Sequence, residues 1–320
     1  MGLKSSSHCC KVAFVGAGKI GREHIRAFSD VPDVEIAGVH SRTRSRAEGL
    51  AKTFNVPFVC DSVQELYEKT HAKLVVVAVP ELAARKVSEA CFRYPWAVFL
   101  EKPPGYNLAD AKAIFKAAKA KRRRVFVALN RRFLSSTRAA LADLQKTGAP
   151  RYIHVQDRQN LQEAAFFGHP KKVVQNWMYA NSIHLIDYLR LFGRGKIVSI
   201  EPVLKWNQRL SDTVMAKVQF SSGDVGIYEG IWMGPGPWAV SITTSEKRWE
   251  LRPLEKAAYQ LPGERTLHAV KSRPWDQNFK PGFRLQAEMA VNAALGKTTD
   301  SVTLDQAMET MGLIRKIFRK

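Results

Sequence analysis

The stretch Lys11-Val-Ala-Phe-Val-Gly16-Ala-Gly18-Lys-Ile-Gly21 joins an apolar run of strand length to a glycine-rich turn. Its Gly16-x-Gly18-x-x-Gly21 spacing lies between a predicted strand and a predicted helix, the context that gives the pattern its meaning. The first glycine permits the tight turn, the second lets the backbone approach a pyrophosphate, and the third lets the helix pack on the strand. N–H groups at the helix start face the phosphates. We therefore expect a dinucleotide to be bound at Gly16, Gly18, Lys19, Ile20 and Gly21.

The second apolar run, 34–39, ends in His40-Ser41-Arg42-Thr43-Arg44-Ser45-Arg46. An NAD site usually carries Asp or Glu here to hold the ribose hydroxyls, and no acid is present. A hydroxyl beside a guanidinium suits a 2′-phosphate, because guanidinium pairs with phosphate oxygens in a bidentate way. The sequence thus favours NADP(H) over NAD(H), with Ser41, Arg42 and Arg46 as contacts. The alternative is that Arg44 and Arg46 form the solvated first turn of a helix.

Composition sets limits on the class of protein. The chain has 320 residues and 45% hydrophobic content, which is enough for two soluble domains. The longest aliphatic run, 74–79, is far short of a membrane span, and no apolar signal-peptide core opens the sequence, so we expect a cytoplasmic protein. The four cysteines form neither a disulfide framework nor a metal pattern, and we expect no metal.

The net charge of +21 is the outstanding feature of the composition. A basic chain can attract nucleic acid, an acidic membrane surface or small anions. Its Lys and Arg residues are spread along the sequence, and no nucleic-acid-binding motif accompanies them. We therefore expect a small-molecule substrate, one that could itself be anionic, and neither nucleic acid nor membrane as a partner.

Segment order predicts the fold class. Strand-like runs lie at 11–15, 34–40, 57–60, 73–79, 96–100 and 124–129, and segments of helix length separate them. Continuous aliphatic runs are typical of parallel strands that are buried on both faces. Residues 1–129 are therefore predicted to form an α/β Rossmann domain with a doubly wound parallel sheet.

After residue 130 the pattern changes to runs separated by turn signals. Strands are predicted at 151–157, 196–206, 212–220, 224–233 and 238–244, and the turn signals at 221–224 and 234–237 separate the last three as in an antiparallel meander. Helices are predicted at 136–147, 176–192, 283–295 and 303–319. Residues 130–320 are therefore predicted to form an α+β domain with an open-faced, mostly antiparallel sheet for substrate binding and oligomerisation.

Two places could carry chemistry. Glu101-Lys102-Pro103 follows a buried strand, so the lysine could hydrogen-bond a substrate oxygen, although a surface ion pair beside a turn explains the residues equally well. Asn181, His184 and Asp187 recur every three residues, which predicts one helix face. A histidine between an amide and a carboxylate is a candidate for proton transfer.

The chain resembles the glucose–fructose oxidoreductase / inositol dehydrogenase / rhizopine-catabolism family (Gfo/Idh/MocA). The resemblance spans nearly the whole chain and is carried by these segments: the glycine turn, Val75-Val-Val-Ala-Val-Pro80, Glu101-Lys102-Pro103, Asn130-Arg131-Arg132-Phe133, His184-Leu-Ile-Asp187 and the 283–289 and 303–311 segments. It implies hydride transfer between NAD(P) and a carbon of a sugar or related polyol, in a homodimer or homotetramer. It also implies that Lys102 polarises the reacting oxygen, that His184 is the acid/base, and that Asp187 and Asn130 line the substrate pocket. Val79, Pro80, Glu81, Glu101 and Lys102 would contact the cofactor.

Two departures from the family pattern bear on activity. Ala180 stands where family members often carry Asp, and the segment after Pro80 lacks the family's histidine. Tyr179 or Asn181 could supply the missing polar contact. The main prediction is an oxidoreductase acting on a sugar, including a nucleotide- or phosphate-linked ketosugar. The alternatives are a non-catalytic dinucleotide-binding regulator and a reductase for a non-sugar carbonyl or imine.

Overall fold

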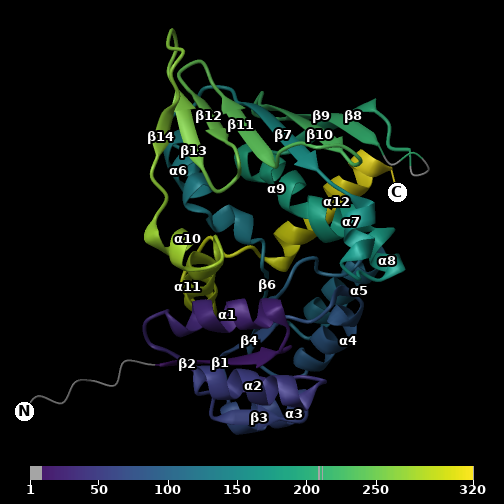
Figure 1. Ribbon diagram of the computed structural model, residues 1–320, viewed down its shortest axis with the longest axis vertical. Helices are drawn as coiled ribbons and strands as arrows, with labels where there is room; N and C mark the ends of the chain where they lie inside the picture. The colour runs from purple at the N-terminus through teal and green to yellow at the C-terminus, as the bar shows by residue number, and fades with distance from the viewer. Residues whose placement is uncertain (1–8, 208–209, 211, 320) are drawn as a thin grey trace, which may run out of the picture. The chain divides into compact units, whose positions relative to one another are not determined.

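A computed structural model describes residues 9–207, 210 and 212–319, and the chain divides into two units. The first unit holds the described residues up to Leu129 together with Asn278–Met308. The second holds Asn130–Gln277 and the residues from Glu309 onward. Figure 1 shows the elements of both. The division differs from the expected ranges in one stretch, because 278–308 groups with the first unit.

The first unit is built on a six-stranded sheet of order β3-β2-β1-β4-β5-β6 in which every pair is parallel. Its strands are β1 (Cys10–Val15), β2 (Val34–His40), β3 (Phe58–Cys60), β4 (Leu74–Val77), β5 (Ala97–Leu100) and β6 (Val125–Val127). Every residue of β4 and β5 is buried, as expected for strands covered on both faces. The predicted doubly wound parallel sheet is confirmed.

Helices cover both faces of this sheet: α1 (Lys19–Ser29), α2 (Arg44–Phe54), α3 (Val63–Thr70), α4 (Glu81–Cys91) and α5 (Leu108–Ala120). Local caps fix some of their starts. The Ser62 hydroxyl accepts the Glu65 N–H at 3.0 Å, and the Asn107 side chain accepts the Asp110 N–H at 2.9 Å. Each bond satisfies one donor that a helix start leaves unpaired.

The segment that returns to the first unit brings α11 (Phe283–Ala294) and the start of α12 (Leu304–Phe318). Helix α11 packs beside α1, as Figure 1 shows, and its buried residues share one apolar core with α1, α2, β1, β2 and β4. The Arg124 guanidinium donates to the carbonyls of Ala293 and Ala294, each at 2.9 Å. A cation at this helix end pairs with carbonyls that the helix itself leaves unbonded.

The second unit is built on an eight-stranded sheet of order β14-β13-β12-β11-β7-β10-β9-β8. Its strands are β7 (Tyr152–Arg158), β8 (Ile197–Leu204), β9 (Thr213–Phe220), β10 (Val225–Ile231), β11 (Ala239–Thr243), β12 (Arg248–Leu251), β13 (Ala257–Gln260) and β14 (His268–Val270). All pairs are antiparallel except β7 with β10.

The predicted meander is wrong at one point, because β7 lies between β10 and β11. The turn 234–237 therefore links two strands that do not pair, and β12, β13 and β14 extend the sheet beyond the predicted strands. Strands β9 and β10 alternate between buried and half-buried residues, and α9 (Ile183–Phe192) packs against β7 and β10. One sheet face is thus covered and the other is open, as predicted.

The remaining helices of the second unit are short: η1 (Asn130–Phe133), α6 (Ser135–Leu144), α7 (Leu161–Phe166), α8 (Lys171–Val174), η2 (Met178–Ser182) and α10 (Pro274–Asn278). The single helix predicted at 176–192 is divided, because η2 is a π-helical segment and α9 begins only at Ile183. The wider π turn shifts side chains relative to the α-helical register on which the shared face of 181, 184 and 187 depended.

Candidate functional site

Four of the predicted cofactor segments follow neighbouring strands of the parallel sheet. The glycine turn follows β1, Ser41 follows β2, Val79 follows β4 and Glu101 follows β5. Carboxyl ends of parallel strands meet at one sheet edge, and β1 beside β4 is where the strand order reverses. Open α/β sheets bind their ligands at such a point.

The three glycines of the turn are required for different geometric reasons. Gly16 has a φ of +110°, and a Cβ there would lie 2.1 Å from the Ala78 carbonyl oxygen. A Cβ at Gly21 would lie 2.3 Å from the Gly16 oxygen, so α1 packs against the turn. A Cβ at Gly18 would meet nothing within 4 Å. Open space at the start of α1, where no side chain caps the helix, fits a phosphate group. Lys19 and Ile20 are exposed beside it.

The basic segment after β2 separates into two kinds of arginine. Arg44 begins α2 and donates to both Glu48 and Asp61, so it has the structural role that the alternative interpretation gave to the arginines. Arg42 and Arg46 are exposed, and neither forms an ion pair with any residue that the structure describes. Ser41 is half-buried at the end of β2. The segment therefore keeps a hydroxyl and two guanidinium groups that form no ion pair with a described carboxylate.

The residues after β4 begin the next helix. Pro80 is exposed at the N-cap of α4, while Val79 and Glu81 are half-buried. Glu81 lies in the first turn, where a carboxylate complements the helix dipole.

Glu101 is held by a residue that the sequence did not single out. The fully buried His24 of α1 lies with its Nε2 2.7 Å from Glu101 Oε1, and its ring stacks on Phe283 at 4.6 Å. The other Glu101 oxygen accepts the Lys102 N–H at 3.0 Å. Helix α1 and the turn carrying Lys102 are thus connected through one carboxylate. His24 was overlooked because the pair is separated by 77 positions along the chain.

In the second unit, the predicted residues divide between two environments. Asp187 accepts two hydrogen bonds from Arg132, at 2.6 and 2.7 Å, and a third from Thr310 at 2.8 Å. The carboxylate is 2% exposed, so this ion pair is part of the interior. Its substrate-binding role stays a prediction, and the geometry shows a structural one. Asn130, at the start of η1, is 6% exposed.

His184 is 7% exposed and lies 6.1 Å, between ring centroids, from Trp238. Arg131 lies over the same indole at 5.6 Å, and it also donates to Glu255. Tyr179 and Ala180 are each 2% exposed, and burial raises the pKa of the Tyr179 hydroxyl. Both residues are buried in the second unit, and neither is among the residues that line the pocket described next.

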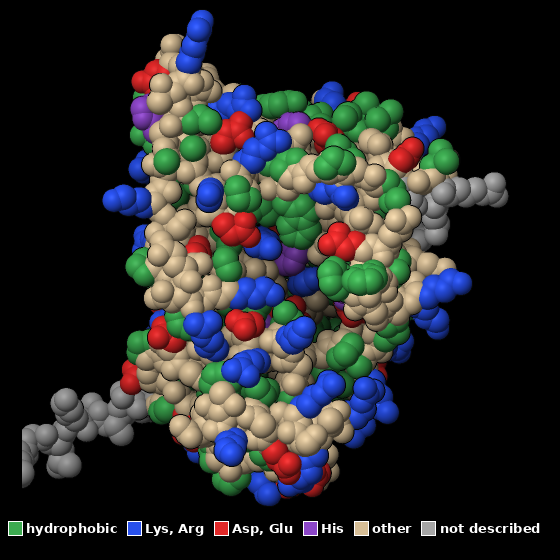
Figure 2. Space-filling view, viewed as in Figure 1, with side chains coloured by type: hydrophobic (Ala, Val, Ile, Leu, Met, Phe, Trp, Pro, Cys, Tyr) green, Lys and Arg blue, Asp and Glu red, His purple; other side chains and the backbone are tan. Residues whose placement is uncertain are grey.

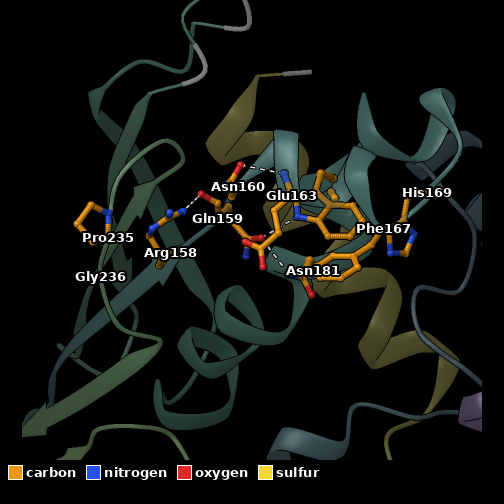
Figure 3. A pocket seen from close by; sticks show the side chains of 11 residues that line it. Arg158, Gln159, Asn160, Glu163, Phe167, His169, Asn181, Pro235 and Gly236 are labelled. Carbon is orange, nitrogen blue, oxygen red and sulfur yellow. Dashed lines mark hydrogen bonds between the residues drawn. The ribbon is translucent and has the colours of Figure 1, made fainter.

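A pocket of about 480 Å³ opens in the second unit between the end of β7, α7, η2 and the turn 234–237 (Figure 3). It is lined by Arg158, Gln159, Asn160, Glu163, Ala164, Phe167, His169, Trp177, Asn181, Pro235 and Gly236. Of the predicted substrate residues only Asn181 is on this wall. The other lining residues were not predicted from the sequence. Those near α7 were overlooked because no helix was predicted at 161–166, although Asn160 followed by Glu163 three positions later is a helix-start pattern.

Behind the pocket wall lies a buried polar network. Asp157 accepts from the Tyr228 hydroxyl at 2.7 Å and from Gln159 Nε2 at 2.6 Å. Gln159 Oε1 accepts from Trp177 Nε1 at 2.8 Å and from Asn181 Nδ2 at 2.9 Å. Burial raises the pKa of Asp157, although the hydrogen bonds it accepts from Tyr228 and Gln159 oppose the rise.

Two further observations concern ligands and partners of other kinds. Within the residues described, no three His, Cys, Asp or Glu side chains are placed to hold a metal ion. Nor does any described helix combine the length and the hydropathy needed to cross a membrane. Figure 2 shows Lys and Arg side chains scattered between acidic and apolar ones over the face in view.

Residues 10–129 match the profile of the oxidoreductase family with an NAD-binding Rossmann fold, GFO_IDH_MocA. These residues belong to the Gfo/Idh/MocA family. The resemblance drawn from the sequence is therefore confirmed, and the match covers the whole six-stranded sheet.

Relatives with assigned names extend the likeness along the chain. Inositol 2-dehydrogenase of Pseudarthrobacter chlorophenolicus is 23% identical over 309 residues, which cover 91% of this chain and 85% of that one. Glucose-6-phosphate 3-dehydrogenase of Bacillus subtilis is 28% identical over 125 residues, covering 39% and 35%. The chain spans 62% and 40% of the lengths of two other matches, as well as 35% of the length of this B. subtilis enzyme.

The fold of both units recurs in solved structures. A dehydrogenase from Chromobacterium violaceum superimposes with a TM-score of 0.81 at 19% identity, covering 98% of this chain and 95% of that chain. At this identity the likeness shows the fold alone. It confirms a Rossmann sheet followed by a mixed, mostly antiparallel sheet.

Proposed function

We propose that the chain is an NADP(H)-dependent oxidoreductase that transfers hydride between the nicotinamide and a carbon of a sugar or sugar derivative. The observation that carries the proposal is the carboxyl edge of the parallel sheet, where open space at Gly18 adjoins the start of α1. The bound dinucleotide would supply or accept the hydride. The protein contributes orientation and proton transfer. Relatives named as inositol and glucose-6-phosphate dehydrogenases support the sugar assignment.

The preference for NADP(H) rests on Arg42 and Arg46. Both are exposed and without an ion-pair partner in the described part of the chain, and no carboxylate follows β2 to repel a 2′-phosphate. Fluorescence titration with NADPH and NADH should show NADPH bound about 10- to 100-fold more tightly, as expected for one or two charge-assisted hydrogen bonds. The difference should shrink as salt is raised.

Arg44→Ala is the matched control for Arg42→Ala and Arg46→Ala. Arg44 lies in the same segment but is already paired with Glu48 and Asp61. We expect the Arg42 and Arg46 variants to lose NADPH affinity while keeping NADH affinity, and the Arg44 variant to keep the preference. Equal binding of NADPH and NADH by the wild-type chain would overturn the NADP(H) assignment.

Lys102 and His184 are the residues to which we assign proton chemistry, following the family resemblance. Lys102 would hydrogen-bond the reacting oxygen, and His184 would give or take its proton. Lys102→Met and His184→Asn should each lower kcat by about 10²- to 10⁴-fold, the usual contribution of a positioned acid or base. Affinity for NADPH should change little in the His184 variant. Full activity of the His184 variant would favour a reductase of a non-sugar carbonyl or imine.

A regulatory, non-catalytic protein of the same fold is the second candidate. It is favoured by Ala180, a buried methyl group where the family often carries a carboxylate. It predicts tight dinucleotide binding with no oxidation of NADPH by any ketosugar. Turnover by the chain alone would exclude it.

A homo-oligomer is the assembly we propose, through the open face of the eight-stranded sheet. That face carries partly exposed apolar side chains, including Tyr152, which is 49% exposed, and the half-buried Met215 and Ile227. Apolar sheet faces of this kind are usually covered. Light scattering should give a dimer or tetramer mass, and Tyr152→Glu should shift it toward the monomer.

A further inference from the structure

His24 of α1 is a fully buried histidine to which the proposed chemistry gives no role. Its Nε2 lies 2.7 Å from Glu101 Oε1, and since a carboxylate oxygen can only accept, the imidazole donates from Nε2. The other ring nitrogen, Nδ1, is buried and has no hydrogen-bond partner among the residues that the structure describes. Within that part of the chain, the ring therefore makes one hydrogen bond, to Glu101.

The surroundings of His24 are aromatic. Its ring stacks on Phe283 of α11 at 4.6 Å between centroids and meets Phe99 of β5 edge-on at 5.7 Å. A buried polar nitrogen without a partner costs about 1–3 kcal/mol in such a place. Leucine or phenylalanine would fill the same space without that cost. Packing alone therefore does not account for a histidine at this position, whereas the bond to Glu101 does.

Glu101 is held through both its backbone and its side chain. Its N–H donates to the Val77 carbonyl at 2.9 Å, which fixes it beside the end of β4. Its Oε2 accepts the N–H of Lys102 at 3.0 Å, while Oε1 is bound by His24. The side chain is 14% exposed, so it lies at the border between the core and the sheet edge. The carboxylate thus connects a buried donor to the backbone that carries Lys102.

Helix α1 connects the same carboxylate to the glycine turn. Gly21 and His24 are three positions apart and both buried, so they lie on one face of the helix. At Gly21 that face packs against the turn, because a Cβ there would lie 2.3 Å from the Gly16 oxygen. The helix whose start is the candidate phosphate site therefore also orients the group that binds the Lys102 N–H.

We propose that His24 is a positioning residue: it holds the Glu101 carboxylate in the orientation that binds the Lys102 N–H, and so fixes where the Lys102 side chain begins. Without the imidazole donor, the carboxylate is free to turn toward solvent and the Lys102 N–H loses its acceptor. A misplacement of about 1 Å at a reacting group can cost about 100-fold in rate. The inference rests on the proposed function in taking Lys102 to bind the reacting oxygen.

The first test is hydrogen exchange at the Lys102 amide, measured by NMR on the full chain. His24→Phe keeps the aromatic packing and removes the donor, whereas His24→Gln keeps a donor at Nε2. We expect exchange at Lys102 to become about tenfold faster or more in His24→Phe, and to stay within about threefold of wild type in His24→Gln. His24→Leu replaces the phenylalanine variant if that one does not fold.

Phe28→Leu is the matched control. Phe28 is fully buried in the same aromatic cluster, its ring centroid 6.3 Å from that of His24 and 5.9 Å from that of Phe99, and its side chain donates no hydrogen bond. This variant should lower the melting temperature and leave exchange at Lys102 within about threefold of wild type. A merely structural role of His24 would instead make both variants speed exchange at Lys102 and at the Val98 and Phe99 amides alike.

The second test is turnover, with NADP⁺ and either myo-inositol or D-glucose 6-phosphate as probes. We expect kcat of His24→Phe to fall about 10- to 100-fold, while the Kd for NADPH changes by less than about threefold. His24→Gln should restore most of the lost kcat, and Phe28→Leu should keep it.

The outcomes separate this role from the proposed function. Unchanged exchange at Lys102 in His24→Phe would overturn the positioning role, whatever the turnover. Unchanged kcat in that variant of an active chain would also overturn it and leave the oxidoreductase standing. A loss of NADPH affinity as large as the loss of kcat would place His24 in the cofactor site instead. Faster exchange at Lys102 in a chain that binds no dinucleotide would support the positioning and overturn the oxidoreductase.

Discussion

The carboxyl edge of the six-stranded sheet and the pocket wall of the eight-stranded unit are two candidate binding surfaces made in different ways. The first consists of backbone at Gly16, Gly18 and the start of α1, with open space where a side chain would stand. The second consists of side chains, from Asp157 through Gln159 to Asn181, each oriented by the one behind it.

The difference lies in where the specificity is encoded. A backbone surface needs residues that lack a side chain, and those residues are adjacent in the sequence. A side-chain surface needs partners from β7, η2 and β10, which only the tertiary fold brings together. A single substitution should therefore abolish binding at the first surface, whereas a single substitution at the second should lower stability or affinity only in part.

Substitution of the turn glycines should give the largest effect. Gly16→Val places a side chain at a φ of +110° and within 2.1 Å of a carbonyl oxygen, so we expect loss of folding or of all dinucleotide binding. At Gly18 an added Cβ meets no atom within 4 Å, so a chain with Gly18→Val should fold normally yet lose NADPH affinity by about 100-fold or more. Thermal unfolding and fluorescence titration together distinguish the two.

Gly18→Val is the sharper of these variants, because its fold is intact. Unchanged NADPH affinity in that variant would mean that the space at the start of α1 does not receive the pyrophosphate.

Removing one hydroxyl from the side-chain surface should have an intermediate effect. Tyr228→Phe deletes the donor 2.7 Å from Asp157 and leaves a buried carboxyl oxygen with one partner fewer. We expect a loss of about 1–3 kcal/mol in the free energy of unfolding, measured by urea denaturation. NADPH binding should be unaffected. A loss of cofactor affinity as large as that of Gly18→Val would contradict the separation of the two surfaces.

The same comparison explains what the sequence could predict. All six parallel strands were placed, because continuous aliphatic runs and glycine punctuation are local signals. Arg42 and Arg46 were predicted as phosphate contacts and Arg44 and Arg46 as a structural alternative, and the structure pairs only Arg44 of these with carboxylates of the described residues. In the second unit β9 and β10 were found from their turn, whereas the insertion of β7 between β10 and β11 was not. The local sequence pattern of a strand does not indicate which distant strand it pairs with in the sheet.

For the pocket, the sequence identified Asn181 but not the reason for its orientation. Gln159 and Asp157 are ordinary residues at a strand end, and their importance comes from Trp177, 18 positions after Gln159, and from Tyr228, 71 positions after Asp157. Asp187 was expected on the same wall, but Arg132 lies 55 positions before it and holds it in the interior.

Asp224 lies away from both surfaces, and its substitution should lower the free energy of unfolding in a pH-dependent way. We expect a change similar to or smaller than that of Tyr228→Phe. Burial alone would raise the pKa of Asp224, but hydrogen bonds from Arg194 and from the backbone N–H groups of Arg151 and Arg194 lower it to about 2. Because the unfolded pKa is about 4, its stabilisation is present above that pH and is lost as pH falls toward 2.

Asp224→Asn should therefore lower the unfolding free energy by about 2 kcal/mol at pH 6, and the difference should shrink as the pH falls below 4 and largely disappear by pH 2. Urea denaturation of both proteins across this range measures it. A constant difference at every pH would assign the effect to packing rather than to charge.

The smallest effect should come from a glycine outside both surfaces. Gly49 lies in α2, and a Cβ there meets nothing within 4 Å. Gly49→Ala should raise the free energy of unfolding by about 0.5–1 kcal/mol, since alanine favours helix. Destabilisation would show that glycine at a helical position has a role here that its surroundings do not reveal.

Helix α11 has a consequence for how the chain is made. Phe283, Ala287, Ala290 and Val291 complete the apolar core beneath α1, yet they are synthesised about 150 residues after β6. A nascent chain that has emerged only to residue 129 therefore holds the whole parallel sheet with part of one face uncovered. It must wait through the synthesis of the entire second unit before that face is closed, an interval in which exposed apolar surface invites chaperones or aggregation. A fragment of residues 1–129, although it holds the complete family match, should be expected to need the 278–308 segment, supplied as a separate peptide or fused by a linker, to become a stable protein.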